Sequence, residues 1–125
     1  MNIIDLSFIG GAANTLPGLG ADPGMTTISG WSGGSFMASN LHVIFSDTIK
    51  GSATVNGAGY AYGEAYPNTG GLFDYDAKRE DLADISYEVA SKYTSSGRID
   101  PMSNLENQPV IAWTGTKDNM IHATL

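Results

Sequence analysis

Apolar and polar residues alternate along the chain in a way that predicts short strands separated by helices. Residues 25–29, 52–58 and 110–114 are short runs with β-branched side chains and predict strands. Between them, residues 35–46 and 76–93 carry apolar side chains at helical spacing. Strands that alternate with helices favour a parallel sheet, so we predict an α/β fold with a small, mainly parallel sheet and flanking helices.

The apolar side chains of each predicted helix recur at helical spacing, which places them on one face of the helix. The face of the first helix consists of Phe36, Met37, Leu41, Ile44 and Phe45. The face of the second helix consists of Leu82, Ile85, Val89 and Tyr93. Gly97, preceded by two serines, is expected to end the second helix, because glycine accepts a left-handed backbone. Residues 57–71 are rich in glycine and tyrosine and predict a loop.

Composition indicates a globular protein and excludes several classes of function. Of 125 residues, 42% are hydrophobic and 15% are charged. The net charge is −7 with only 6 Lys and Arg, so we expect no binding to nucleic acid or to an anionic membrane. No cysteine is present, which excludes thiolate chemistry, and we expect neither a metal nor a cofactor.

The sequence shows no membrane or export segment. A membrane-spanning helix needs a run of about eighteen apolar residues, and every apolar run of this sequence is shorter. The N-terminal residues lack the basic start of a signal peptide, so the cellular location is unknown.

Residues 30–34 have the sequence GWSGG and satisfy the G-x-S-x-G pattern of a nucleophile elbow. A predicted strand precedes Ser32 and a predicted helix follows it, and the small residues on either side let the two elements approach closely. The turn would expose the Ser32 Oγ, and the N–H of Gly33 would be an oxyanion donor at the helix start. A glycine-rich turn without chemistry also fits the pattern. A phosphate-binding loop fits poorly, because Ser35 and Phe36 stand where it needs Lys and Ser or Thr.

Two blocks resemble the polyhydroxybutyrate depolymerases and related secreted esterases of the α/β-hydrolase class. The first is LPGLGADPGMTTISGWSGGSFMASNLHVIFSDTIKG, and the second is GRIDPMSNLENQPVIAWTGTKDNMI; together they cover roughly half of the chain. The resemblance implies a partial α/β-hydrolase that attacks hydroxyalkanoate polyesters or similar esters through an acyl-enzyme. It implies Ser32 as the nucleophile and Asp118 as the acid that orients a catalytic histidine. It also implies circular permutation, with the strands that usually precede the elbow coming last.

The predicted triad lacks its base. Of the two histidines, His42 lies on the predicted helix about 15 Å beyond Ser32, so we predict a structural role. His122 follows Asp118 on the same loop and is predicted to be a surface or turn residue. In the family that the chain resembles, the catalytic histidine comes later, so we expect it beyond Leu125. We therefore predict a single, incomplete domain over residues 1–125 that is inactive or very weak alone.

Several alternatives stay open at this point. Asp118 lies in a Gly-Thr-Lys-Asp-Asn sequence, which is also an ordinary turn. Trp31 and Tyr60 are candidates for contact with an ester polymer, although aromatic residues of this region also suit packing over the sheet. The alternative function is an inactive hydrolase remnant or a binding module. Because the predicted sheet is small, we also expect self-association through an exposed sheet edge.

Overall fold

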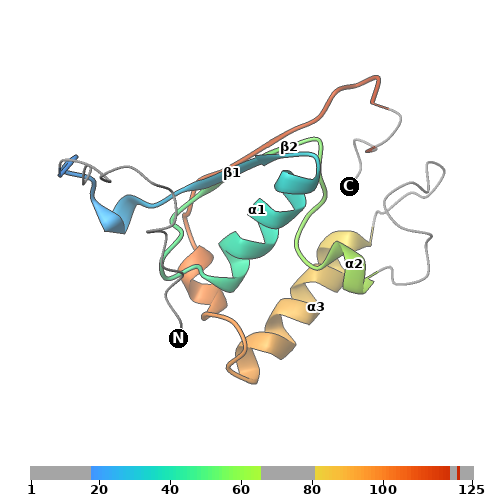
Figure 1. Cartoon of the computed structure of the whole chain (residues 1–125). Coiled ribbons are helices and arrows are strands. Elements are labelled where there is room, and N and C mark those ends of the chain that lie inside the picture. The colour runs from blue at the N-terminus through green and yellow to red at the C-terminus, as the bar shows by residue number, and fades with distance from the viewer. Residues whose placement is uncertain (1–17, 66–80, 119–120, 122–125) are drawn as a thin grey trace, which may run out of the picture.

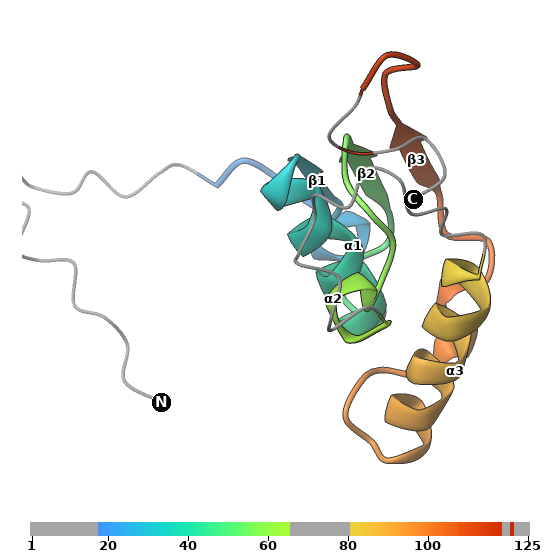
Figure 2. The same cartoon turned by 90° about the vertical axis from the view of Figure 1, so that its right-hand side faces the viewer.

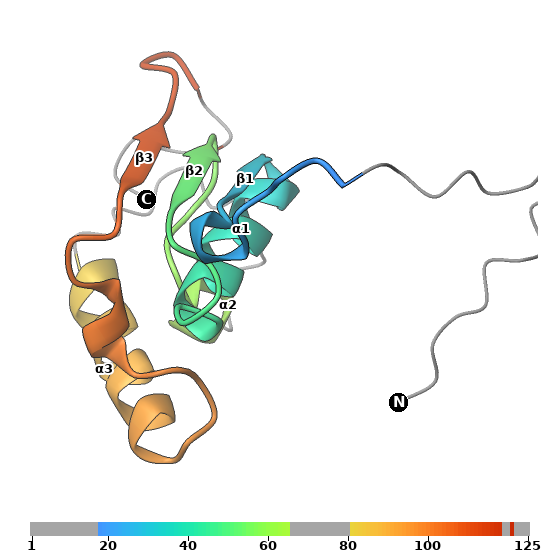
Figure 3. The same cartoon turned by 90° about the vertical axis from the view of Figure 1, so that its left-hand side faces the viewer.

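The computed structural model describes residues 18–65, 81–118 and 121. Its helices and strands, in chain order, are a 3-10 helix Pro23–Met25, β1 Ile28–Trp31, α1 Gly33–Ile44, β2 Ser52–Val55, α2 Tyr62–Ala65, α3 Leu82–Ser95, a 3-10 helix Met102–Leu105, and β3 Val110–Trp113. The strands form one parallel sheet in the order β1-β2-β3, as Figure 3 shows. The α/β prediction, with a small parallel sheet and flanking helices, is therefore confirmed.

The carboxyl ends of the strands lie at one edge of the sheet. The registers place the last residue of each strand in one row, which contains Trp31, Val55 and Trp113. The ladder continues one residue further, because the Ser32 N–H donates to the Val55 carbonyl and the Asn56 N–H donates to the Trp113 carbonyl, both at 2.9 Å. Residues that directly follow the strands are therefore neighbours across this edge.

Helices α1 and α3 lie on the same side of the sheet, as Figures 1 and 2 show. Right-handed crossovers that step across a sheet in one direction place their helices on one face. No described element covers the opposite face, which we call the open face; by strand alternation it consists of Ser29, Trp31, Ala53, Val55, Ile111 and Trp113. Its large side chains are consequently exposed. Trp31, Ile111 and Trp113 keep 72%, 65% and 60% of their surface accessible.

Helix α1 buries a different face from the one predicted. Its buried residues are Ser35, Ala38 and His42. Met37 and Phe45, both part of the predicted apolar face, are 58% and 50% exposed. The reason is the close approach of α1 to β1, since a Cβ on Gly30 would lie only 2.0 Å from the Gly34 carbonyl oxygen. Small side chains fit this interface, and the predicted apolar face was wrong in that respect.

Three predicted boundaries were also wrong, each for a local reason. Strand β1 begins at Ile28, three residues later than predicted, and Met25 instead ends a 3-10 helix whose N-cap Asp22 accepts the Gly24 N–H at 2.8 Å. Strand β2 ends at Val55, because Asn56 takes a left-handed backbone with φ 50°. The predicted loop after β2 contains α2. The second helix ends as predicted, with Gly97 at φ 68°; residues 66–80, where its predicted start falls, lie outside the described residues.

The core joins the two helices through the segment that follows β2. Tyr62 and Leu82 are buried with Ala58, and the Phe36 ring meets the Tyr62 ring edge-on with centroids 5.8 Å apart. Tyr60 belongs to a second buried cluster with Ala61 and Ala90. The described aromatic residues of this segment therefore pack against the helices. Within the residues that the structure describes, every helix is too short or too polar to cross a membrane.

Candidate functional site

The turn between β1 and α1 holds Ser32 in an unusual backbone conformation. Ser32 has φ 53° and ψ −121°, and its side chain is exposed. A positive φ is uncommon for a residue other than glycine, and such outliers cost about 1–3 kcal/mol each. Strain of this kind persists where surrounding structure enforces it, and it concentrates at functional sites. The turn is thus the first candidate for chemistry.

Gly30 is what permits this turn. A Cβ at Gly30 would lie 2.0 Å from the carbonyl oxygen and 2.2 Å from the carbonyl carbon of Gly34. These are backbone atoms, so no side-chain rearrangement relieves the contact. A Cβ at Gly34 itself would meet nothing within 4 Å. Both flanking glycines were predicted to let the strand and the helix approach closely. Only Gly30 does so through its missing side chain, because the backbone of Gly34 occupies the position that a Cβ of residue 30 would take.

The start of α1 presents backbone donors beside Ser32. The Ser32 carbonyl accepts the N–H groups of Ser35 at 2.8 Å and Phe36 at 3.3 Å. Gly33 and Gly34 occupy the first two helical positions, where an N–H has no acceptor within the helix. Both glycines are exposed. The positive end of the helix dipole therefore lies next to the Ser32 side chain.

Polar residues that the sequence analysis missed lie in the same row as Ser32, at the carboxyl ends of the strands. Asn56 and Thr114 directly follow β2 and β3, so they continue the row that contains Ser32. Asn56 Oδ1, Thr114 Oγ1 and Ser35 Oγ are buried and, within the described part of the chain, have no hydrogen-bond partner. The Asn-Gly dipeptide at 56–57 is a turn signal, and it was available to mark the end of β2 at this edge.

Asp118 lies beyond the same edge as Ser32. It follows β3 after a turn in which its N–H donates to the Gly115 carbonyl at 2.9 Å. Its Oδ1 accepts the Ile121 N–H at 3.0 Å, and the side chain is half-buried. Ser32 follows β1 and Asp118 follows β3. Because β2 lies between these two strands, β1 and β3 are about 10 Å apart. The fold thus brings Ser32 and Asp118 to one edge, with the end of β2 between them.

His42 lies at the other end of the sheet. Its Nε2 is 2.6 Å from Gln108 Oε1 and its Nδ1 is 2.9 Å from the Ser52 hydroxyl. Because an amide oxygen only accepts, Nε2 carries the hydrogen and Nδ1 accepts from Ser52. Ser52 opens β2, whereas Ser32 follows the end of β1. With 4% of its surface exposed, His42 has the structural role that was predicted. His122 lies outside the described residues.

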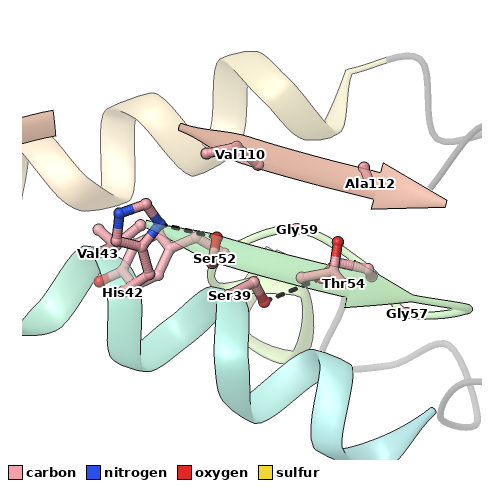
Figure 4. Close-up of a pocket in the computed structure, with 11 residues that line it drawn as sticks. Ser39, His42, Val43, Ser52, Thr54, Gly57, Gly59, Val110 and Ala112 are labelled. Carbon is pink, nitrogen blue, oxygen red and sulfur yellow. Dashed lines mark hydrogen bonds between the residues drawn. The ribbon is translucent and has the colours of Figure 1, made fainter. Parts of the chain in front are cut away.

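A cavity of about 260 Å³ lies between α1, β2 and β3, and Figure 4 shows it. Ser32 does not line it. Four of its polar side chains already have partners within the protein: His42 and Ser52 bond to each other, Ser39 donates to the Ala58 carbonyl at 3.0 Å, and Thr54 donates to the Ile111 carbonyl at 3.3 Å. The serine, threonine and histidine side chains of the cavity are therefore already engaged within the protein.

The two aromatic candidates lie in different surroundings. Trp31 is the last residue of β1, directly before Ser32, and is exposed on the open face. Tyr60 is 9% exposed and lines a hollow of about 230 Å³ with Ile44, at the far end of α1 from Ser32. Burial raises the pKa of Tyr60, and the neighbouring Tyr93 and Glu64 raise it further, because a negative charge near the phenolate disfavours its ionisation. Within the described residues, no cluster of three or more His, Cys, Asp or Glu side chains is positioned to hold a metal.

Comparison with known proteins gives two named relatives. The chain is 37% identical over 113 residues to a poly(3-hydroxybutyrate) depolymerase of Delftia acidovorans, covering 88% of this chain and 22% of that protein. It is 27% identical over 111 residues to a polyhydroxybutyrate depolymerase of Talaromyces funiculosus, covering 88% of this chain and 31% of that protein. No family model matches, and no solved structure matches. The chain is thus related in sequence to polyhydroxybutyrate depolymerases and spans less than a third of either relative.

Proposed function

We propose that this chain carries the nucleophile and the acid of a serine ester hydrolase that acts on hydroxyalkanoate polyesters. The observation that supports the proposal best is the backbone of Ser32, at φ 53° and ψ −121° between a parallel strand and a helix. A G-x-S-x-G serine that acts as a nucleophile occupies a strained strand-to-helix turn, and the backbone of Ser32 is consistent with that role. The sequence relationship to polyhydroxybutyrate depolymerases supports the substrate class.

In this proposal, the Ser32 Oγ attacks the ester carbonyl carbon while an imidazole base takes its proton. The oxyanion that forms is stabilised by the N–H of Gly33 at the positive end of α1. The tetrahedral intermediate collapses with cleavage of the ester C–O bond, and the base returns the proton to the leaving alkoxide. Water then attacks the acyl-Ser32 ester, releasing the acid and restoring the serine.

Asp118 has the role of orienting the imidazole in this scheme. Asp118 follows β3 and Ser32 follows β1, with β2 between them. An imidazole placed over the end of β2 could therefore bond to Ser32 through one ring nitrogen and to Asp118 through the other. The base belongs to a segment outside the described residues, because His42 lies at the opposite end of the sheet with both ring nitrogens engaged. Trp31, exposed beside Ser32, is proposed to contact the polymer chain.

The test is ester hydrolysis by the purified chain in the presence of free imidazole, which can take the role of the base. The assay measures release of p-nitrophenol from p-nitrophenyl butyrate, after subtraction of the rate with imidazole alone. We expect imidazole-dependent turnover that Ser32→Ala abolishes and Asp118→Asn lowers. Ser29→Ala is the matched control, since it removes an exposed serine of β1 three positions before Ser32. Equal rates for the wild-type chain and Ser32→Ala would reject Ser32 as the nucleophile.

A second candidate is a binding module that retains the polyester surface without turnover. It is favoured by one observation: the histidine in the described part of the chain, His42, lies away from the Ser32 edge. This alternative expects the chain to bind polyhydroxybutyrate granules, with binding weakened by Trp31→Ala and unaffected by Ser32→Ala. A sedimentation assay with granules therefore separates it from the catalytic proposal.

A further inference from the structure

We propose that Asn56 is a site of spontaneous deamidation, which converts its neutral amide into a carboxylate at the edge of the sheet that holds Ser32. Asn56 is the only asparagine of the chain that is followed by glycine. In deamidation, the backbone nitrogen of the next residue attacks the side-chain carbonyl carbon, and a side chain on that next residue obstructs the approach. Gly57 has no side chain, so the local sequence leaves the attack open.

The two reacting groups are not held by hydrogen bonds. Asn56 Oδ1 has no partner within the residues that the structure describes. The Gly57 N–H likewise donates to no acceptor in that part of the chain. The ladder ends one residue earlier, where the Asn56 N–H donates to the Trp113 carbonyl at 2.9 Å. Ring closure between the Gly57 nitrogen and the Asn56 side chain therefore breaks no hydrogen bond of the described structure.

Two other asparagines show that these features are not general. The amide of Asn40 is bonded on both sides, because its Nδ2 donates to a backbone carbonyl at 2.7 Å and its Oδ1 accepts a backbone N–H at 3.2 Å. Asn107 has a left-handed backbone like that of Asn56, with φ 62° against 50°. It is followed by Gln108, whose N–H donates to the Leu105 carbonyl at 3.2 Å. An unbonded glycine nitrogen thus distinguishes Asn56 from both.

The reaction needs no reagent other than water. The Gly57 nitrogen bonds to Asn56 Cγ and gives up its proton, and the side-chain nitrogen leaves with it as ammonia. The product of this step is a cyclic imide. Water then adds to either imide carbonyl and breaks one C–N bond, which gives aspartate or isoaspartate. Each product has one new carboxylate in place of the amide.

The new charge would lie one strand away from Ser32. Residues 32 and 56 directly follow neighbouring strands, which are about 4.8 Å apart. The effect on activity rests on the proposed function, in which attack by Ser32 develops negative charge on the substrate oxygen. A carboxylate at position 56 repels that charge and opposes the stabilisation by the positive end of α1. We therefore expect deamidation to lower ester turnover.

Mass spectrometry of the full chain tests the modification directly. The folded chain is incubated at mildly alkaline pH, sampled over time, and digested briefly under mildly acidic conditions. We expect the peptide with Asn56 to gain the mass of an amide-to-acid conversion and to resolve into aspartate and isoaspartate isomers. The peptides with Asn40 and Asn107 are the internal controls and are expected to stay unchanged over the same period.

Three results would overturn the proposed modification. The first is an Asn56 that stays unmodified in the folded chain while it reacts in urea, since the fold would then prevent ring closure. The second is conversion of Asn107 at the same rate, because the unbonded glycine nitrogen would then have no influence. The third is aspartate without isoaspartate, because opening of the imide gives both.

The effect on turnover is measured separately with two variants. Asn56→Asp carries the charge of the aspartate product, and Asn56→Gly is the uncharged control that accepts a left-handed backbone. Circular dichroism verifies that both are folded. In the p-nitrophenyl butyrate assay with imidazole, we expect Asn56→Asp to be about tenfold slower than Asn56→Gly. Equal rates would overturn the placement of the charge beside Ser32. No imidazole-dependent turnover by the unmodified chain would reject the proposed function instead, and the mass result would stand.

Discussion

Gly57 is predicted to be intolerant of a side chain for a purely steric reason. A Cβ at this position would lie 2.3 Å from both the Cβ and the Oγ of Ser35, more than 1 Å inside ordinary contact. Ser35 is fully buried in the first turn of α1, so it has no space into which to move. Gly57 does not have a positive φ, and alanine therefore adds no backbone strain. We expect Gly57→Ala to lower the free energy of unfolding by about 1–3 kcal/mol, the usual cost of overpacking.

The clash has a specific suppressor. Ser35→Gly removes both atoms that a Cβ on residue 57 would meet, at a helix-propensity cost of about 0.5 kcal/mol. It also removes a buried hydroxyl that lacks a partner among the described residues. The double variant is therefore expected to be about as stable as Ser35→Gly alone, with a coupling energy of about 1–3 kcal/mol. Ser35→Ala leaves the Cβ at 2.3 Å and is expected to give no rescue.

Urea unfolding followed by circular dichroism, at a protein concentration below any dimerisation, gives the four free energies of this cycle. Strictly additive effects of Gly57→Ala and Ser35→Gly would refute the close packing of Gly57, two residues after β2, against Ser35 of α1. Rescue by Ser35→Ala as well would show that the hydroxyl alone makes the contact.

Three further predictions concern the rest of the fold. Gly30→Ala is expected to cost more than Gly57→Ala, since its Cβ would lie 2.0 Å from a backbone oxygen that no side-chain change can move; the same urea titration measures it. His42→Ala leaves Gln108 and Ser52 without their hydrogen-bond partner and is expected to lower the free energy of unfolding by about 1–3 kcal/mol for each of them. Imidazole-dependent ester turnover per folded molecule is expected to stay unchanged, and a loss of turnover would contradict the structural role of His42. The hydrogen bond from Tyr93 to Glu64 raises the pKa of Tyr93 above 10.0. This hydrogen bond therefore stabilises the folded state fully below pH 10.0, and its contribution is lost as the pH rises through the raised pKa. Tyr93→Phe should remove part of this alkaline loss, and an unchanged pH profile would contradict the assignment.

The sequence was sufficient to predict the order of β1, α1, β2, α3 and β3, although not α2 or the 3-10 helices, because periodicity and glycine punctuation are local signals. The position of Ser32 between a strand and a helix follows from the same signals. The buried face of α1 was mispredicted, since hydrophobicity marks Met37 and Phe45 but does not show how closely the helix approaches β1. That distance is a tertiary property, set by Gly30 and Gly34.

The row formed by Ser32, Asn56 and Thr114 could not be predicted either, because it depends on the register between strands. Only the left-handed backbone of Asn56 had a local signal, the Asn-Gly dipeptide. The open face has a similar origin. An exposed Ile111 in a short apolar strand has the same sequence pattern as a buried one, and only the side on which α1 and α3 pack distinguishes them.

The most direct test of the proposed function is to identify the residue that an activated fluorophosphonate modifies. In this reaction the serine Oγ bonds to phosphorus and fluoride leaves, so the adduct records the nucleophile itself. The chain is incubated with the reagent and free imidazole, digested, and analysed by mass spectrometry. We predict a single adduct on the peptide that contains Ser32, absent from Ser32→Ala and retained by Ser29→Ala. No adduct, or an adduct that persists in Ser32→Ala, would contradict it.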